Sequence, residues 1–193
     1  MHKPSQLRII SSFFVLITIM VYIIATYSIE NSEAHTPRYP LIIIPGFSGT
    51  ILQTPDTGAF VEDLPDGHGG LFSHIYPANE EVWININEAA KPGHDDYFDI
   101  LGLQTDGVTP LARLGAVGAV REVYQPTIDY FTNKGYVLNR DLYVFGYDWR
   151  IDIENTSNNL NELIQRAKSR TGMPRVNVIA HSMGGLVLRL YLS

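Results

Sequence analysis

The sequence predicts an α/β fold with a mostly parallel sheet and flanking helices, and two kinds of pattern lead to this prediction. Short apolar runs without polar alternation are typical of strands buried on both faces of a parallel sheet, and they occur at 41–44, 142–145 and 176–180. Helical patterns of apolar residues occur at 125–134, 159–169 and 183–190. Strands that alternate with helices in this way favour a parallel sheet.

The composition narrows the classes of function. The chain has 193 residues and a formal net charge of −6, without a basic stripe, so nucleic acid is not an expected partner. It has no cysteine, which excludes disulfides, thiolate catalysis and cysteine-based zinc sites. The acidic loop residues around His94 and Asp63 lack metal-ligand spacing, so we expect neither a metal nor a cofactor. Nothing in the sequence sets an oligomeric state.

The first segment, 1–35, is predicted to direct export. Lys3 and Arg8 precede an apolar stretch at 9–25, and small residues at 32–34 are suitable for cleavage. The stretch is long for a signal peptide and slightly short for a membrane span. A signal peptide and an N-terminal membrane anchor, each with a linker, therefore both stay open. Either predicts a secreted or membrane-anchored protein outside the cytoplasm.

The remainder, 36–193, is predicted to form the N-terminal part of one catalytic domain. Within it, 51–110 has many Gly, Pro, Asp and His residues and weak periodicity. Residues 82–87 alternate and predict a strand. A long irregular stretch inside a domain is usually functional, so we interpret 51–110 as a lid or binding insertion.

The segment that carries the chemistry is Ala180-His181-Ser182-Met183-Gly184, a variant of the G-x-S-x-G nucleophile elbow. A serine on a tight strand-to-helix turn needs small neighbours two residues away, which Ala180 and Gly184 provide. The N-terminus of the following helix favours a developing oxyanion. Side chains of adjacent residues diverge at such a turn, so His181 is expected to pack rather than act as the base.

A second loop, Pro45-Gly46-Phe47-Ser48-Gly49, follows the first apolar run. In enzymes built around this elbow, the loop after an early strand supplies another oxyanion donor, and glycines allow its backbone to approach closely. The backbone N–H of Phe47 is our candidate. An ordinary strand-ending turn is the alternative interpretation.

Three motifs together resemble one known family. They are the loop at 45–49 after the isoleucine run, Tyr147-Asp148-Trp149-Arg150 after a strand, and the elbow at 180–185. Their order and spacing resemble the lecithin:cholesterol acyltransferase family of α/β-hydrolases over roughly 40–193. The elbow alone would fit any lipase or esterase, whereas the Tyr-Asp-Trp-Arg block narrows the resemblance.

The resemblance implies a partial α/β-hydrolase fold and a serine-dependent acyl transfer from a lipid ester, to water or to an alcohol. It implies that Ser182 is the nucleophile and that the N–H groups of Phe47 and Met183 form the oxyanion hole. It also implies that Trp83 belongs to a lid or membrane-binding insertion that receives the lipid. The expected partner is a lipid ester at a membrane or lipoprotein-like surface.

One departure from the family pattern concerns the catalytic triad. In this fold the chain order is serine, then acid, then histidine, but residues 183–193 contain neither an acid nor a histidine. We therefore expect the triad Asp and His beyond residue 193, and this chain alone to be inactive. Asp148 is expected to hold Arg150 or a turn instead. The alternative functions are a non-catalytic, membrane-tethered lipid-binding remnant and a generic lipase or esterase.

Overall fold

A computed structural model describes residues 19–20, 38–65, 71–93 and 95–193. The predicted signal peptide or anchor lies almost entirely outside the described residues. Within those ranges, no helix combines the length and the apolar composition needed to cross a membrane. Residues 38–193 form one folded unit, which we describe by itself.

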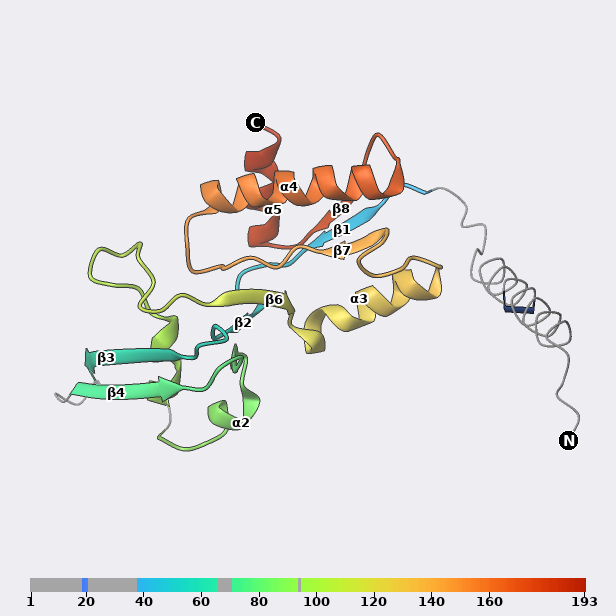
Figure 1. Ribbon diagram of the computed structural model, residues 1–193. Helices are drawn as coiled ribbons and strands as arrows, with labels where there is room; N and C mark the ends of the chain where they lie inside the picture. Colours follow the sequence, from blue (N-terminus) through green and yellow to red (C-terminus); the bar gives the residue numbers. More distant parts are fainter. Residues whose placement is uncertain (1–18, 21–37, 66–70, 94) are drawn as a thin grey trace, which may run out of the picture. The chain divides into compact units, whose positions relative to one another are not determined.

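The predicted parallel sheet is present in the order β7-β1-β8. Strand β1 (Leu41–Ile44) lies in the middle and pairs in parallel with β7 (Leu142–Val144) and β8 (Asn177–Ala180), as Figure 1 shows. The central residue Ile43 is in register with Val144 on one side and Ile179 on the other. All three strands were predicted from their apolar runs.

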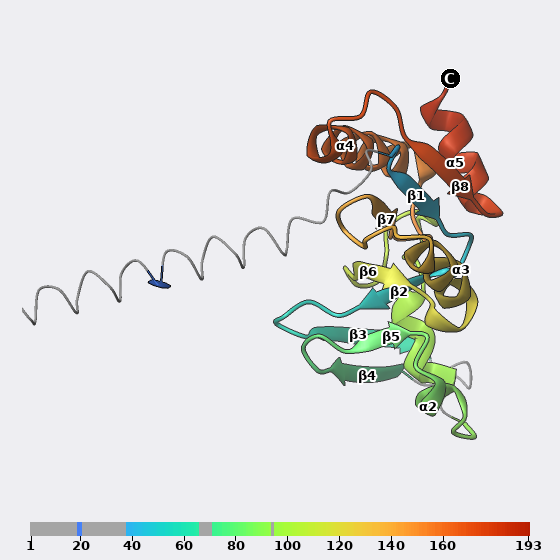
Figure 2. The ribbon, with the colours of Figure 1, turned by 90° about the vertical axis from the view of Figure 1, so that its right-hand side faces the viewer.

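Helices cover both faces of this sheet, and the alternation of β1 explains how. Ile42 and Ile44 join the core cluster that includes residues of α4 (Ile153–Thr171) and α5 (Met183–Tyr191). Leu41 and Ile43 join a separate cluster with α3 (Arg121–Asn133). Figure 2 shows α4 and α5 on one side of β1 and α3 on the other. All four β1 side chains are therefore buried, as the prediction required.

The prediction that all three strands are buried on both faces is wrong for β8. This strand pairs only with β1, and its residues are half-buried or exposed, with Ile179 39% exposed. Val178 and Ala180 pack against the core, whereas Asn177 and Ile179 lie on the opposite face. In this chain β8 is an edge strand, so its second face lacks the cover that its sequence suggests.

Two helices are longer than predicted. The helix predicted at 159–169 extends over Ile153–Thr171, from the N-cap Asp152 to Gly172 at φ 70°. The helix predicted to open at Gln125-Pro126 begins at Arg121 instead, with Pro126 inside it. Pro126 is exposed, so water can reach the carbonyl that loses its N–H partner.

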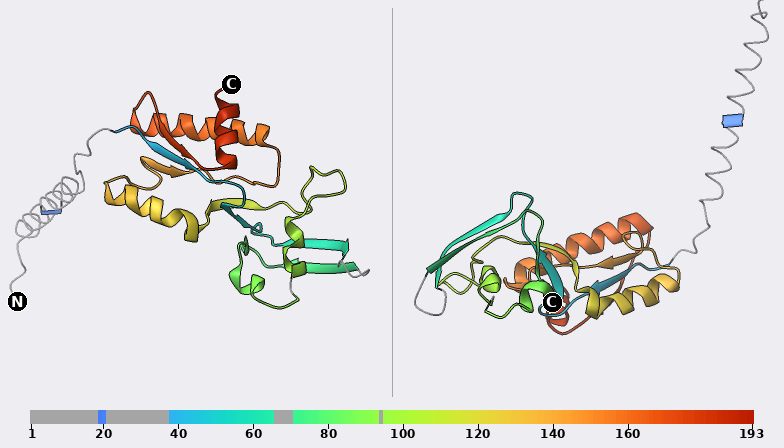
Figure 3. Two further views of the ribbon diagram at one scale, coloured as in Figure 1. Left: turned by 180° about the vertical axis from the view of Figure 1, so that it is seen from behind. Right: turned by 90° about the horizontal axis from the view of Figure 1, so that it is seen from below.

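The region predicted as an irregular insertion is largely structured. Strand β2 (Thr50–Gln53) pairs antiparallel with β5 (Glu81–Trp83) and β6 (Gly115–Ala119). Strands β3 (Ala59–Pro65) and β4 (Leu71–Tyr76) form a hairpin, which Figure 3 shows apart from the parallel sheet.

The strand predicted at 82–87 is partly wrong. Strand β5 ends at Trp83, and Asn85 accepts a hydrogen bond from the backbone of Glu88 as the N-cap of α2 (Ile86–Ala89). The short 3₁₀ helix η1 (Asp95–Leu101) then completes the insertion.

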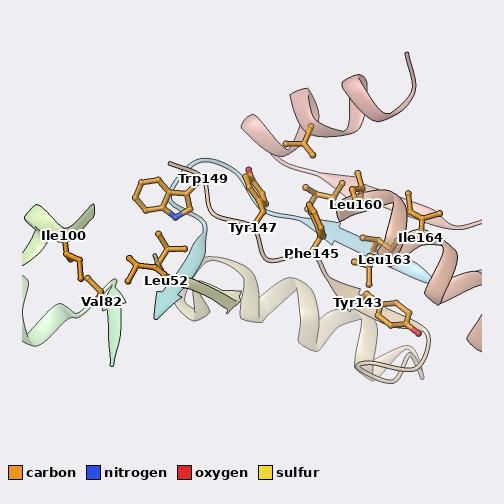
Figure 4. Packing of buried hydrophobic residues seen from close by; sticks show 14 of the residues in the cluster. Leu52, Val82, Ile100, Tyr143, Phe145, Tyr147, Trp149, Leu160, Leu163 and Ile164 are labelled. Atoms are coloured by element: carbon orange, nitrogen blue, oxygen red, sulfur yellow. The ribbon is translucent and has the colours of Figure 1, made fainter. Parts of the chain in front are cut away.

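One hydrophobic cluster connects the insertion with the parallel sheet. Figure 4 shows this cluster, whose labelled members include Ile100, Val82, Leu52, Trp149, Phe145 and Leu160. The fold is therefore a mixed α/β structure in which the parallel sheet has three strands and the other described sheets are antiparallel.

Candidate active site

Ser182 lies at the sharp turn between β8 and α5, as the elbow motif predicts. Its backbone has φ 53° and ψ −124°, a region that is costly for a residue with a side chain. The N–H groups of Gly184 and Gly185 close the turn by donating to the carbonyls of His181 and Ser182, at 2.9 and 2.8 Å. The serine itself is exposed.

Gly184 is needed because the helix α5 crosses very close to β1. A Cβ atom at Gly184 would lie 2.7 Å from the carbonyl oxygen of Ile44, and the Pro45 oxygen would be closer still. A Cβ at Gly185 would meet nothing within 4 Å. Only the first glycine of the pair is therefore required by close contact.

The loop after β1 folds directly against this turn. The N–H of Gly49 donates to the carbonyl of Gly46 at 3.0 Å, and Ser48 has φ 54° at the third turn position, as in a type II turn. A Cβ at Gly46 would lie 2.9 Å from Cβ of Ser182. The two loops that the sequence singled out are thus adjacent in space.

The two candidate oxyanion donors flank this contact. Phe47 follows Gly46, and Met183 is the first residue of α5, where an N–H group has no partner within the helix. Within the described part of the chain, neither N–H donates a hydrogen bond to another protein group. Both are therefore available to a ligand at Ser182.

Tyr124 and His181 connect the two loops. The hydroxyl of Tyr124 accepts a hydrogen bond from the N–H of Gly46 at 2.8 Å and lies 2.9 Å from Nδ1 of His181. The ring of His181 packs edge-on against that of Tyr124 at 6.1 Å, as the prediction of a packing residue implies, and the hydrogen bond is an additional role that was not predicted. No motif singled out Tyr124, which lies one residue before the helix predicted at 125–134.

Two residues of the Tyr-Asp-Trp-Arg block form hydrogen bonds with the same loop. The hydroxyl of Tyr147 donates to the carbonyl of Pro45 at 2.9 Å, and burial raises the pKa of Tyr147 to about 12. The indole N–H of Trp149 donates to the carbonyl of Thr50 at 3.2 Å. These two residues hold both ends of the loop that contains Phe47.

Asp148 and Arg150 form a structural pair, as expected. Two guanidinium nitrogens of Arg150 donate to the two carboxylate oxygens of Asp148, at 2.9 and 2.7 Å. The same guanidinium donates to the carbonyls of Ile100 and Ala112, at 3.1 Å each. The pair is engaged in holding the insertion and does not contact Ser182.

Trp83 connects the insertion with the loop after β1. Its indole N–H donates to the carbonyl of Ser48 at 2.6 Å, and its ring packs edge-on against Trp149 and Phe98. Phe47, which is 62% exposed, also packs edge-on against Trp149, at a ring distance of 4.9 Å. An aromatic row thus runs from beside the elbow into the insertion.

No base for Ser182 is found among the residues that the structure describes. Within these residues, no histidine or carboxylate forms a hydrogen bond with the Ser182 hydroxyl. His74 instead packs against the rings of Tyr76 and Tyr97, while His68 and His94 lie outside the described ranges. Nor do the described histidines and acids include a group of three that could hold a metal ion.

Comparison with known proteins gives consistent results. Residues 105–193 match the family model described as lecithin:cholesterol acyltransferase. The chain is 25% identical over 181 residues to an Arabidopsis thaliana protein named phospholipase A(1) LCAT3, covering 84% of this chain and 39% of that protein. It is 24% identical over 167 residues to lecithin-cholesterol acyltransferase-like 4 from the same plant, covering 79% of this chain and 30% of that protein.

The chain thus spans less than half the length of either curated relative. The family model covers the Tyr-Asp-Trp-Arg block and the elbow, two of the three motifs on which the resemblance rests. On these matches the chain resembles the lecithin:cholesterol acyltransferase family, most clearly over 105–193.

Proposed function

We propose that this protein is a serine acyl hydrolase or O-acyltransferase that acts on a lipid ester, built on an α/β-hydrolase fold. The observation that carries the proposal is the position of Ser182. It stands at a strained turn between a parallel strand and a helix, with the Gly46–Gly49 loop packed against it. The similarity to the lecithin:cholesterol acyltransferase family and to a protein named phospholipase A(1) LCAT3 supports a lipid substrate.

In the proposed reaction, Oγ of Ser182 attacks the carbonyl carbon of the ester. The N–H groups of Phe47 and Met183 donate to the oxyanion of the tetrahedral intermediate. Collapse of the intermediate breaks the ester C–O bond, and the leaving alcohol takes the proton that the serine gave up. Water or another alcohol then attacks the acyl-serine, which releases the acid or a new ester and restores the serine.

The proton transfers require a base and an acid that orients it. The described residues do not supply them, and the curated relatives are more than twice as long as the region that aligns with them. We therefore assign both groups to the part of a full-length protein that this chain does not span. The 193 residues alone then have the nucleophile and the oxyanion donors without the base.

The insertion at 51–110 is proposed to receive the lipid. Trp83 lies at its junction with the loop after β1, and the exposed ring of Phe47 continues the same aromatic row. Such a row offers apolar surface to an acyl chain beside the nucleophile. The N-terminal sequence supports a location outside the cytoplasm, at a membrane or another lipid surface.

A fluorophosphonate probe tests the proposal, because it reacts with an activated serine and leaves a stable adduct on Oγ. A general base contributes about 10²–10⁴-fold, so the 193-residue chain should label weakly and a chain extended to the length of its relatives at least about 100-fold faster. Ser182→Ala should abolish labelling in both, whereas Ser169→Ala, an exposed serine on α4, should change neither.

The outcomes separate the alternatives. Rapid labelling of Ser182 in the short chain would mean that a base lies within these residues. If the extended chain does not label but still binds phospholipid vesicles, the proposal of an enzyme is wrong and the protein is a non-catalytic lipid-binding protein.

A further inference from the structure

The hydroxyl of Tyr124 lies at the point where three segments of the active site meet. Tyr124 belongs to the first turns of α3, and its side chain is only 6% exposed. Its hydroxyl bonds to the N–H of Gly46 in the loop after β1 and to Nδ1 of His181 in the elbow. A buried phenol with two partners from two different loops is well placed to fix their separation.

The loop after β1 is folded around this tyrosine. A Cβ atom at Gly49 would lie 2.8 Å from the Tyr124 hydroxyl oxygen and 2.9 Å from its ring. Gly46 and Gly49 are joined by the hydrogen bond of the turn. Both ends of the turn therefore contact Tyr124, and Phe47 lies between them.

The available protons decide which group donates and which accepts in each of these two hydrogen bonds. The hydroxyl of Tyr124 accepts from the N–H of Gly46, so it donates its single proton to His181 when Nδ1 is unprotonated. The imidazole then carries its proton on Nε2. In this arrangement the N–H of Gly46, the hydroxyl of Tyr124 and Nδ1 of His181 are all hydrogen-bonded.

We propose that Tyr124 is a positioning residue that holds the N–H of Phe47 at the correct distance from Ser182, with His181 orienting the phenol. The N–H of Phe47 shares a planar peptide unit with the carbonyl of Gly46, which accepts from the N–H of Gly49. Holding the N–H of Gly46 as well as this carbonyl therefore restricts where the Phe47 donor can lie. The catalytic part of this inference rests on the proposed function, whereas the network itself does not.

The network can be tested by hydrogen exchange followed by mass spectrometry on the full chain in detergent micelles. Tyr124→Phe removes only the hydroxyl, and loss of one such hydrogen bond is worth about a five- to tenfold change in an opening equilibrium. The amide of Gly46 should exchange faster by about that factor. The amide of Phe145, which donates to Ile43 at 2.8 Å, reports opening of the sheet and should not change.

The matched control is Tyr130→Phe, on the exposed side of the same helix, where Tyr130 is 58% exposed. It should leave the exchange of Gly46 unchanged. Equal acceleration at Gly46 and Phe145 would show that Tyr124 contributes only general stability, and no acceleration at Gly46 would show that the bond is absent. Either result overturns the proposal.

Variants of His181 test the second half of the network. Asparagine places an amide oxygen close to the position of Nδ1, so His181→Asn should keep the exchange of Gly46 slow. His181→Ala removes the acceptor and should accelerate it. Equal exchange rates in the two variants would remove His181 from the network.

The catalytic consequence is read from the labelling of Ser182 in the extended chain. Removing an oxyanion donor costs about 10²–10³-fold in related chemistry, so displacing one through its support in Tyr124→Phe should slow labelling by roughly tenfold. Unchanged labelling despite faster Gly46 exchange would overturn the positioning role. If the unmodified extended chain does not label at all while the exchange results hold, the proposed function fails and the network stands.

Discussion

The region around the elbow and the insertion at 51–110 are held together by different kinds of core. Between β1 and the helices α4 and α5 the core is rich in aliphatic side chains, with Ile42 and Ile44 fully buried. In the insertion, aliphatic residues such as Val82 are buried too, but tyrosines join them through hydrogen bonds. Tyr76 donates to the carbonyl of Tyr97 at 2.8 Å, and Tyr97 donates to the carboxylate of Glu80 at 2.7 Å.

This difference determines how well each region tolerates substitutions of its core side chains. Burial and the neighbouring carboxylates raise the pKa of both Tyr76 and Tyr97 well above the usual value. Their hydroxyls must therefore stay protonated and paired for the insertion to remain folded. An aliphatic core tolerates changes of shape, whereas a core with buried hydroxyls depends on each donor finding its acceptor.

The largest effect is expected where the two regions are joined. The side chain of Arg150 is 2% exposed and connects Asp148 with two carbonyls, those of Ile100 and Ala112. Removing one partner of a buried ion pair costs about 3–5 kcal/mol, because the other charge stays buried and unpaired. We expect Arg150→Ala to lower the free energy of unfolding by that amount in urea denaturation.

Arg113 provides the control, since it is an exposed arginine close to Ala112 in the sequence. Arg113→Ala should change stability by less than about 0.5 kcal/mol. A loss below about 1 kcal/mol for Arg150→Ala would mean that the insertion is held by its hydrophobic contacts alone.

The same contrast explains which parts of the fold the sequence predicted. The apolar runs of β1, β7 and β8 are short and lie between helical patterns, so those strands were located correctly. The exposure of β8 does not follow from its own composition, because a strand's composition does not tell how many neighbours it has. The hairpin of β3 and β4 was missed, because Phe60 and Ile75, which pair across it, are both exposed and interrupt any alternation.

For the candidate site, sequence motifs located the residues of the turn and the Tyr-Asp-Trp-Arg block, but neither Tyr124 nor the contacts that the block makes. Ser182 and Gly184 belong to a recognisable local pattern with a mechanical reason for each position. Tyr124 lies 57 residues before His181 and contacts it only through tertiary folding. Side-chain-to-backbone bonds of this kind, like that of Tyr147 to Pro45, leave no periodic signal. The roles of Ser182, Phe47, Met183 and Trp83 stay predictions.

A smaller effect is expected at the glycine pair of the elbow, which compares one crowded position with one open position on the same helix. At Gly184 an added methyl group would overlap backbone oxygens of β1, so Gly184→Ala should cost about 1–3 kcal/mol. At Gly185 there is open space, and alanine is favoured over glycine in a helix by about 1 kcal/mol. Thermal unfolding should place the two variants on opposite sides of the unmodified chain. Similar destabilisation by both would show that α5 does not approach β1 as closely as the structure has it.

The smallest effect is expected from the buried phenol beside the oxyanion loop, and it depends on pH. Tyrosine in an unfolded chain has a pKa of about 10, and burial raises that of Tyr147 to about 12. Between these values the unfolded state loses the proton first, so the contribution of Tyr147 is complete below pH 10 and is lost as the pH rises through 12.

Tyr147→Phe should therefore lose some stability at neutral pH, about 1 kcal/mol for the bond to Pro45, and should then decline less steeply than the unmodified chain between pH 10 and 12. Urea midpoints measured in steps from pH 8 to 12 give both profiles.

Tyr97→Phe should flatten the decline in the same direction, because burial and Glu80 raise the pKa of Tyr97 as well. Parallel profiles for Tyr147→Phe and the unmodified chain would mean that the Tyr147 hydroxyl reaches water, and the loop of Phe47 would then lose one of its two supports. A flatter profile for Tyr147→Phe but not for Tyr97→Phe would mean that the region beside the elbow depends on a buried, hydrogen-bonded hydroxyl. The insertion would then tolerate the loss of its own hydroxyl at Tyr97.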